Sequence, residues 1–393
     1  MLKSFYKKLT ARFCRPDCAA GNPGAEALNL AAPECDSSSI TSAASDDVQS
    51  LVDQMLANGR YGLLLRPQIA QNLNIDLYSM GKAALEQEMG LVPQGEVHLE
   101  PSVFDVDYAL FVADGSETPN GLVIPVHSVF LDRYSVTNKQ FQRFVSSGGY
   151  QEMAIWDREV LPAVLDFTDT TGQPGPRFWK NGRYPPGEAN LPVVGVSWYE
   201  AVAYARWVGK RLPTDAEWVK SGSWPVTLSP GNHLQRKYPW GDTMDRHKAN
   251  VWGSGPGRIV PVDEFAEGVS VGGLYQLIGN VWEWTATSLD VDPSAEEDGH
   301  VASALLKSIR GGAFDTYFEN QANCQFASGE NPILRKHNIG FRCALSVCDI
   351  APPPNPMRPV PLELASSVEE TEQLETESNW QSNCQPAEVE ILV

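Results

Sequence analysis

The sequence has no apolar run long enough to cross a bilayer, which argues against an integral membrane protein. Its basic beginning, Met1–Pro16, also has no apolar core of the kind that a secretory signal needs. A surface-binding amphipathic helix and an organelle transit peptide are alternatives for this segment. We interpret it as a frayed basic end and expect a protein without a membrane span.

Cysteine is scarce and scattered. The seven cysteines are an odd number, and four of them fall in the expected terminal tails, so they do not suggest a disulfide framework. Cys14, Cys18 and Cys35 do not match a standard zinc-binding spacing. We therefore expect a reducing, cytoplasmic environment.

Familiar catalytic and metal-binding patterns are missing. There is no phosphate-binding loop, no Gly-x-Ser-x-Gly elbow and no His-Glu-x-x-His pair. The six histidines have no metal-binding spacing, although ligands that converge from distant segments leave non-haem iron open as an alternative. The formal charge of −19 makes nucleic acid a poor partner, because its phosphates repel an acidic protein.

What the chain does contain divides it into four parts. Residues 1–50 are basic and then rich in serine and alanine, and residues 349–393 carry nine acidic residues against one basic residue, so both segments are predicted to be disordered. Residues 51–91 have apolar residues at helical spacing and predict a helical extension. Residues 92–348 hold ten of the eleven tryptophans, which places the main core in this domain.

Three helix starts in the domain carry the capping-box pattern, in which Ser or Thr is followed three positions later by Glu or Gln. The pairs are Thr137 with Gln140, Ser197 with Glu200, and Thr214 with Glu217. Glu217 is therefore assigned to helix capping, and Asp215 to a first turn where the helix dipole favours an acid. Beyond Trp218 regular patterning fades, which predicts a loop-rich fold with few, short strands.

Seven ordered motifs of this domain are similar to those of one known family. In chain order they are VTNKQFQRFV (136–145), the segment 192–218 that ends in RLPTDAEW, YPWGD (238–242), ANVW (249–252), GLYQLIGNVWEWT (273–285), RGGAF (310–314) and IGFRCA (339–344). Together they resemble the formylglycine-generating enzymes, the sulfatase-modifying factors. The resemblance implies the C-type-lectin-like fold of that family, which is α+β with little regular secondary structure.

The resemblance also implies a chemistry, the oxidation of a substrate cysteine to formylglycine by Cu(I) held between two cysteines. The positions of those cysteines hold Thr316 and Gln321 here, and the neighbouring serine and histidine positions hold Ala313 and Tyr317. Cu(I) is soft and selects thiolate or thioether ligands, whereas hydroxyl and amide oxygens are hard. We therefore expect no copper and no formylglycine production by the copper route.

The disulfides of active eukaryotic members have no counterpart either. The positions of one pair hold Cys343 and Ala205, and those of the other hold Gly222 and Phe326. Cys343 is then expected to be a buried small apolar residue.

Calcium is a further implication of the resemblance. The first site would use the side chain of Gln276, the carbonyls of Gly279 and Val281, and the Glu283 carboxylate. Calcium accepts such irregular sets of six to eight oxygens. The alternative is that Glu283 is a buried acceptor of hydrogen bonds from backbone amides or an arginine.

A second calcium site of the family would use Asn250 and the Val251 carbonyl. The loop that completes it is shortened here, around Gly253–Arg258, and this argues against the second site.

The family cleft is the expected binding site. Its residues here would be Trp282, Thr316, Tyr317, Gln321 and Cys324. Trp282 and Trp284 alternate along a strand, so we expect one to point inward and one toward the cleft, with core packing as the alternative. We predict that the cleft binds a peptide, a small molecule or a protein partner. The alternatives are a divergent metal-dependent oxidoreductase, of formylglycine-generating or non-haem-iron type with another ligand set, and a lectin-like adhesion module.

Overall fold

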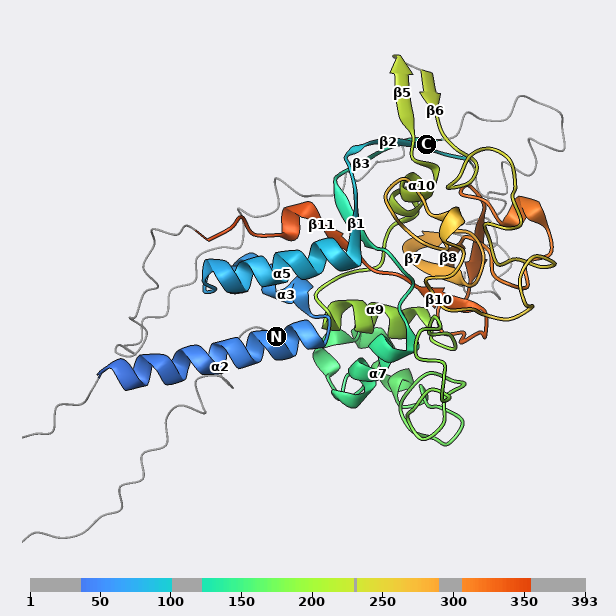
Figure 1. The fold of residues 1–393 in the computed structure, drawn as a ribbon. Helices are drawn as coiled ribbons and strands as arrows, with labels where there is room; N and C mark the ends of the chain where they lie inside the picture. The colour runs from blue at the N-terminus through green and yellow to red at the C-terminus, as the bar shows by residue number, and fades with distance from the viewer. Residues whose placement is uncertain (1–36, 101–121, 230–231, 290–305, 355–393) are drawn as a thin grey trace, which may run out of the picture.

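The computed structural model describes residues 37–100, 122–229, 232–289 and 306–354, and their α+β architecture confirms the predicted fold class (Figure 1). The α-helices are α2 (Ser37–Ala57), α3 (Tyr61–Leu64), α4 (Pro67–Ala70), α5 (Ile75–Glu88), α7 (Asn138–Ser146), α8 (Leu161–Val164), α9 (Trp198–Trp207) and α10 (Asp215–Ser223). Short 3-10 turns are η1 (Met153–Ile155), η2 (Arg158–Val160), η3 (Ala266–Gly268), η5 (Glu319–Gln321) and η6 (Val347–Asp349). No described helix has the length and apolar character needed to cross a bilayer.

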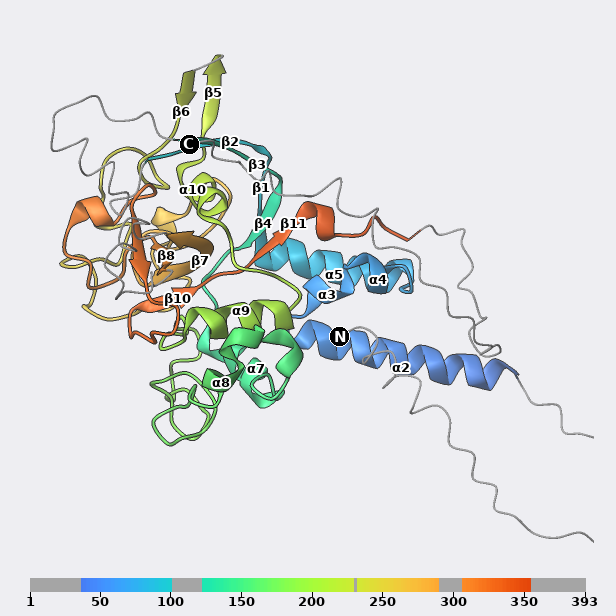
Figure 2. The ribbon, with the colours of Figure 1, turned by 180° about the vertical axis from the view of Figure 1, so that it is seen from behind.

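The strands are short. They are β1 (Met89–Val92), β2 (Gly95–Leu99), β3 (Leu122–Val126), β4 (Val129–Asp132), β5 (Val226–Ser229), β6 (Asn232–Leu234), β7 (Trp282–Leu289), β8 (Leu306–Arg310), β9 (Ala327–Glu330), β10 (Ile339–Phe341) and β11 (Ala344–Ser346). They form a sheet in the order β10-β7-β8-β9, a second in the order β1-β4-β11, and the pairs β2-β3 and β5-β6. β10 runs parallel to β7, and the other pairings are antiparallel. Figures 1 and 2 show the N-terminal helices on one side of the molecule and the β7-β8 sheet on the other.

All three predicted capping boxes are present. In each, the N–H of the cap residue donates to the Glu or Gln side chain at 2.7–2.9 Å, and the N–H three residues later donates to the cap hydroxyl. α9 ends at Trp207, just before Gly209, whose φ of +79° suits glycine. These local patterns therefore fix the starts of α7, α9 and α10.

The helical extension begins earlier and ends earlier than predicted. α2 begins at Ser37, within the segment predicted to be disordered, and its last turns bury Val52 and Met55 in a core. The later helix, α5, ends at Glu88, because Met89–Val92 pairs with β4 as a strand. Residues 1–36, which belong to the predicted disordered start, lie outside the described residues.

The folded domain also continues past the predicted boundary at residue 348. The Tyr78 hydroxyl donates to the carbonyl of Ala351 at 2.7 Å, and the N–H of Ala351 donates to the carbonyl of Leu65 at 2.8 Å. The start of the predicted acidic tail is therefore hydrogen-bonded to the N-terminal helical segment. Residues 355–393 of that segment lie outside the described part.

A buried ion pair joins the helical extension to the domain. The Lys210 ammonium donates to Asp132 Oδ1 and to the Tyr61 hydroxyl, both at 2.6 Å. Burial raises the pKa of Tyr61 and keeps the phenol protonated. Because Tyr61 lies in α3 and Asp132 in β4, the helices and the β1-β4-β11 sheet share one polar contact inside the core.

The core of the domain is aromatic. Phe141 packs against the rings of Phe144, Tyr204 and Phe341 at centroid distances of 5.2–6.3 Å. Cys343 is fully buried beside this cluster with a free thiol, as predicted.

Candidate functional site

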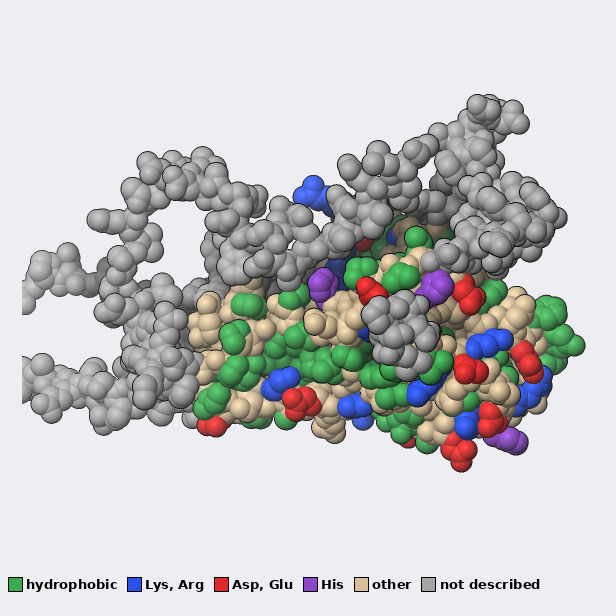
Figure 3. Space-filling view, turned by 90° about the horizontal axis from the view of Figure 1, so that it is seen from above, with side chains coloured by type: hydrophobic (Ala, Val, Ile, Leu, Met, Phe, Trp, Pro, Cys, Tyr) green, Lys and Arg blue, Asp and Glu red, His purple; other side chains and the backbone are tan. Residues whose placement is uncertain are grey.

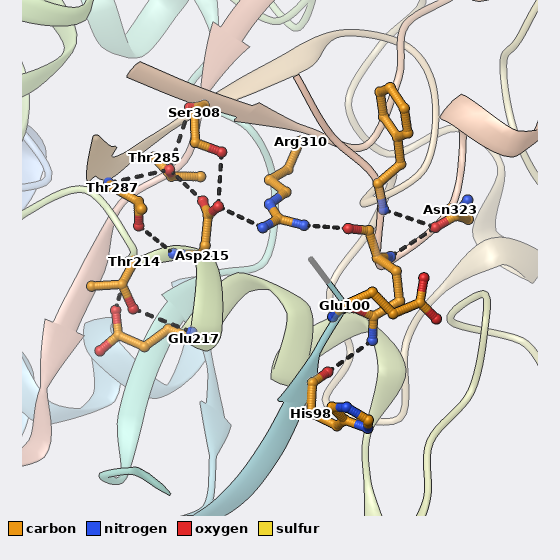
Figure 4. Close-up of polar contacts among 12 residues, drawn as sticks. His98, Glu100, Thr214, Asp215, Glu217, Thr285, Thr287, Ser308, Arg310 and Asn323 are labelled. Atoms are coloured by element: carbon orange, nitrogen blue, oxygen red, sulfur yellow. Dashed lines mark hydrogen bonds and ion pairs between the residues drawn. The ribbon is translucent and has the colours of Figure 1, made fainter. Parts of the chain in front are cut away.

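The candidate site is built on the end of strand β8. The Arg310 guanidinium, at this end, donates to the Asp215 carboxylate on α10 (Figure 4). The hydroxyls of Thr285 and Ser308 donate to the same carboxylate at 2.6 and 2.8 Å. The side chains of Asp215 and Arg310 are each only 5% exposed. Asp215, assigned from the sequence to the helix dipole, therefore also fixes β8 to α10.

Arg310 holds the loop that follows it as well. We call residues 311–326 the GG loop. Arg310 Nη1 donates to the carbonyl of Gln325 at 2.6 Å, and Asn323 Oδ1 accepts from the N–H groups of Gln325 and Phe326 (Figure 4). One guanidinium thus ties the end of the loop to its beginning.

Two glycines turn the chain into the GG loop. Gly311 and Gly312 have φ angles of +97° and +78°, which disfavour other residues. A Cβ on Gly311 would lie 2.3 Å from the carbonyl oxygen of Leu277, so backbone packs where a side chain would be. The turn brings the chain to the surface within a few residues.

Thr316 and Gln321, at the family's copper-thiolate positions, lie in this loop. Thr316 is buried, and its hydroxyl accepts a hydrogen bond from the N–H of Ala313 at 2.8 Å. Gln321 ends η5 and is half-buried. Thr316 therefore uses its oxygen to close a turn, and neither residue offers the soft donor that Cu(I) prefers.

Three large rings stand exposed around these positions. Trp252, Tyr317 and Phe318 are 56%, 65% and 59% exposed, and we call them the aromatic face. The Tyr317 ring lies 6.1 Å from that of Trp252 and 5.2 Å from that of Phe318. The N–H of Trp252 donates to the carbonyl of Thr316 at 3.3 Å, so the face is attached directly to the GG loop.

The surroundings of the aromatic face are polar. Arg246 forms a half-exposed ion pair with Glu319 at 2.7 Å. Asp315 accepts two hydrogen bonds from Asn338 at 3.1 Å, with the exposed imidazole of His337 at 3.4 Å. In Figure 3, charged side chains of both signs crowd the right-hand half, and hydrophobic side chains project at its edge, the side on which Figure 1 draws the orange turn η5. Apolar rings with a charged surround are typical of a binding surface.

The structure separates the five predicted cleft residues. Tyr317 is on the surface, whereas Trp282 is 8% exposed and packs against Phe326, and Trp284 is fully buried. Trp282 and Trp284 are two positions apart in β7, so they lie on the same face of the sheet, and both are buried in the aromatic core, which favours the core-packing alternative. Cys324 is fully buried too.

Cys324 is placed as a structural residue. A Cβ added to Gly222 would lie 2.9 Å from its sulfur, so the thiol fills the space that this glycine leaves. Burial raises the pKa of Cys324, which keeps the thiol protonated and poorly nucleophilic.

Trp252 and Phe318 are site residues outside the five that the sequence predicted for the cleft. Trp252 ends the ANVW motif, in which only Asn250 and Val251 were given a role. Exposure of an indole depends on tertiary packing, and the sequence signal was limited to its place before a Gly-rich loop.

The predicted calcium ligands do not fit calcium in their present arrangement. The Glu283 carboxylate accepts hydrogen bonds from Ser135 and Trp218 and two from the buried Arg342 guanidinium, all at 2.7–2.8 Å. The amide of Gln276 is engaged as well, because its oxygen accepts from Asn280 at 2.7 Å. This geometry favours the alternative interpretation, in which Glu283 is a buried partner of an arginine.

The second predicted calcium pair is engaged in part by protein atoms. The Val251 carbonyl accepts from the N–H and the hydroxyl of Ser254. Among the described residues Asn250 Oδ1 is buried and has no hydrogen-bond donor, and Gly255 packs so closely that a Cβ there would lie 1.8 Å from it. The Val251 carbonyl is thus already engaged, whereas the Asn250 oxygen is not.

In the ranges that the structure describes, no group of three or more His, Cys, Asp and Glu side chains converges as a metal site would require. His98, His127, His247 and His337 are exposed, and His300 lies outside those ranges.

The sequence is similar to proteins that carry several different names. The mouse (Mus musculus) formylglycine-generating enzyme is 32% identical over 257 residues, covering 56% of this chain and 67% of its own. The serine/threonine-protein kinase Pkn1 of Chlamydia trachomatis is 33% identical over 237 residues, and hercynine oxygenase of Mycolicibacterium thermoresistibile is 30% identical over 245 residues. The matched region spans 57% of this chain in both cases, but only 35% of the kinase and 52% of the oxygenase.

The chain also matches solved structures and one family model. PvdO from Pseudomonas aeruginosa is 19% identical with a TM-score of 0.41, and its match covers 66% of this chain and 94% of PvdO. The model described as sulfatase-modifying factor enzyme 1-like domain matches residues 78–347, from the first turn of α5 to the start of η6. Because that match takes in the GG loop, all four strands of the β10-β7-β8-β9 sheet and most of the chain, this protein belongs to the sulfatase-modifying factor family.

Proposed function

We propose that this protein is a binding module that holds a peptide segment of a partner protein on the aromatic face and does not make formylglycine by the copper route. One observation carries the proposal. Where the family resemblance places two thiolates, the GG loop has a turn-closing hydroxyl and an amide, and three large rings are exposed beside them.

The rings suit a peptide ligand. Exposed Trp and Tyr supply large, stiff contact areas, and they are enriched at the energetic centres of protein interfaces. Arg246, Glu319 and Asp315 offer charged and hydrogen-bonding groups to the backbone of a bound segment. We infer that an apolar side chain of the partner covers the rings while this rim orients its main chain.

A metal-dependent oxidoreductase is the competing proposal, since hercynine oxygenase is among the relatives. Copper loading separates the two proposals. Under reducing Cu(I), we expect substoichiometric copper and no loss of thiol from a cysteine-containing sulfatase peptide, because the loop lacks a thiolate pair. Metal content is measured on the purified chain, and the peptide by mass spectrometry. Stoichiometric copper with conversion of the thiol to an aldehyde overturns our proposal, as does near-stoichiometric iron with a redox activity that chelation removes.

The binding proposal itself makes a prediction for the aromatic face. Peptides selected from a random display library on the full chain are expected to lose roughly tenfold or more in affinity on the Trp252→Ala/Tyr317→Ala variant, because truncation of a hot-spot ring costs ~2 kcal/mol or more. Affinity is measured by titration calorimetry. Met80→Ala, an exposed apolar change on α5, serves as the matched control and should bind normally. Equal affinity for all three proteins would contradict the proposed face.

A further inference from the structure

A cavity of about 140 Å³ lies where the end of α10 meets the turn between β1 and β2. Its walls include Pro93, Gln94, Glu96, Lys220, Trp224 and Pro225. A volume of ~150 Å³ accommodates a benzene ring, so this space has room for a compound of a few carbon atoms.

Lys220 brings a buried amine to this cavity. The residue is only 5% exposed, and a Cβ on Gly95 would lie 2.8 Å from its Nζ, so the amine occupies space that the glycine leaves open. Within the described ranges, the structure gives this nitrogen neither a hydrogen-bond acceptor nor an ion-pair partner. Lys210, the other buried lysine, has both. Burying an amine without a hydrogen-bond partner costs free energy of folding, and such groups are rare in native structures, so this one suggests a function.

The backbone beside the amine is in an uncommon conformation. Trp224 ends α10 at φ 43° and ψ 66°, the left-handed region that bulky residues seldom adopt. A Cβ on Gly272 would lie 2.8 Å from its indole, so close packing holds the ring at the cavity wall. Such conformations are concentrated at ligand-binding and catalytic sites.

We propose that Lys220 is a nucleophilic amine that captures small aldehydes or ketones in this cavity as imines. This site is separate from the aromatic face and goes beyond the proposed function. The nitrogen lone pair attacks the carbonyl carbon and forms a C–N bond. The carbonyl oxygen then takes up protons and leaves as water, which gives the C=N bond without any oxidant or reductant.

The surroundings of Lys220 favour the neutral, nucleophilic form. Burial lowers the pKa of its ammonium, so more of the amine is unprotonated near neutral pH. Glu96 is the ionisable residue that β2 contributes to the cavity wall, while β1 and β3 carry no ionisable side chain. Trp224, Pro93 and Pro225 give part of the wall an apolar surface against which the carbon chain of a small carbonyl compound can pack.

Reductive labelling tests the proposal on the full chain. The protein is incubated with propanal and cyanoborohydride at neutral pH, and each lysine is quantified by peptide mass mapping. We expect Lys220 to be modified faster than the exposed Lys139 and Lys180, by roughly twofold or more, because a lower pKa leaves a larger fraction of the amine in its neutral, reactive form. A rate at Lys220 equal to or below that of these surface lysines overturns the proposal.

Two variants test whether fast labelling depends on the Lys220 amine and on the space around it. Lys220→Met should abolish the fast label and leave the melting temperature unchanged or higher, because it removes an unpartnered buried amine. A sharp fall in melting temperature would show that the amine has a structural partner and would contradict the assignment. Gly95→Ala, which places a methyl group against the amine, should slow labelling of Lys220 but not of Lys139 in protein that remains folded.

Discussion

Arg342→Met is expected to lower the free energy of unfolding by ~3–5 kcal/mol, because the change leaves the Glu283 charge buried without its cation. Both side chains are at most 1% exposed, and the guanidinium reaches both carboxylate oxygens of Glu283. It also donates to the carbonyls of Asp132 and Tyr275, so its loss frees further buried acceptors. Urea unfolding followed by tryptophan fluorescence measures the effect.

Arg246→Met is the control for this prediction, and the melting temperature in calcium and in chelator tests whether Glu283 binds a metal. Arg246→Met breaks the half-exposed pair with Glu319 and should cost less than ~1 kcal/mol. The melting temperature of the unmutated protein should be the same in calcium and in chelator, because Arg342 already neutralises Glu283. A calcium-dependent rise that disappears in Glu283→Gln would restore the calcium interpretation of this carboxylate.

Arg310→Met should have an effect of similar size, again ~3–5 kcal/mol, since Asp215 would keep its buried charge with only two hydroxyl donors. The same change cuts the bond to the Gln325 carbonyl. We therefore expect faster amide hydrogen exchange in the GG loop, which depends on this bond, while α9 keeps its protection.

The control for this change is Lys336→Met, which removes a partner of Glu330 on a half-exposed side chain. It should alter the free energy of unfolding by less than ~1 kcal/mol. If Arg310→Met lowered the free energy of unfolding no more than this control, the ion pair between Asp215 and Arg310 would not stabilise the packing of β8 on α10 as we infer.

Features set by residues close together in the chain could be predicted from the sequence. The capping boxes of α7, α9 and α10 were predictable because each involves residues three positions apart. The family and the α+β class were predictable because seven motifs keep their order. The replacement of the copper thiolates was visible too, since Thr316 and Gln321 can be read directly from the chain.

What required the structure was burial and long-range pairing. Trp282 and Cys324 looked like cleft residues, but packing against Phe326 and Gly222 covers them. The sequence analysis named an arginine as an alternative partner of Glu283, but it could not choose Arg342, which lies 59 residues away. The surroundings of Lys220 depend on two segments, residues 92–96 and 220–225, that meet only in the fold.

The clasp of Ala351 by Tyr78 and Leu65 has a practical consequence for how the molecule is presented. It holds the last described residues against the N-terminal helices, and Figures 1 and 2 draw these helices on the opposite side of the molecule from the β7-β8 sheet. A dye or resin attached through the exposed face of α5 would therefore lie on the other side of the molecule from the strand that leads into the GG loop. Protein immobilised in this way should keep that side accessible to a partner.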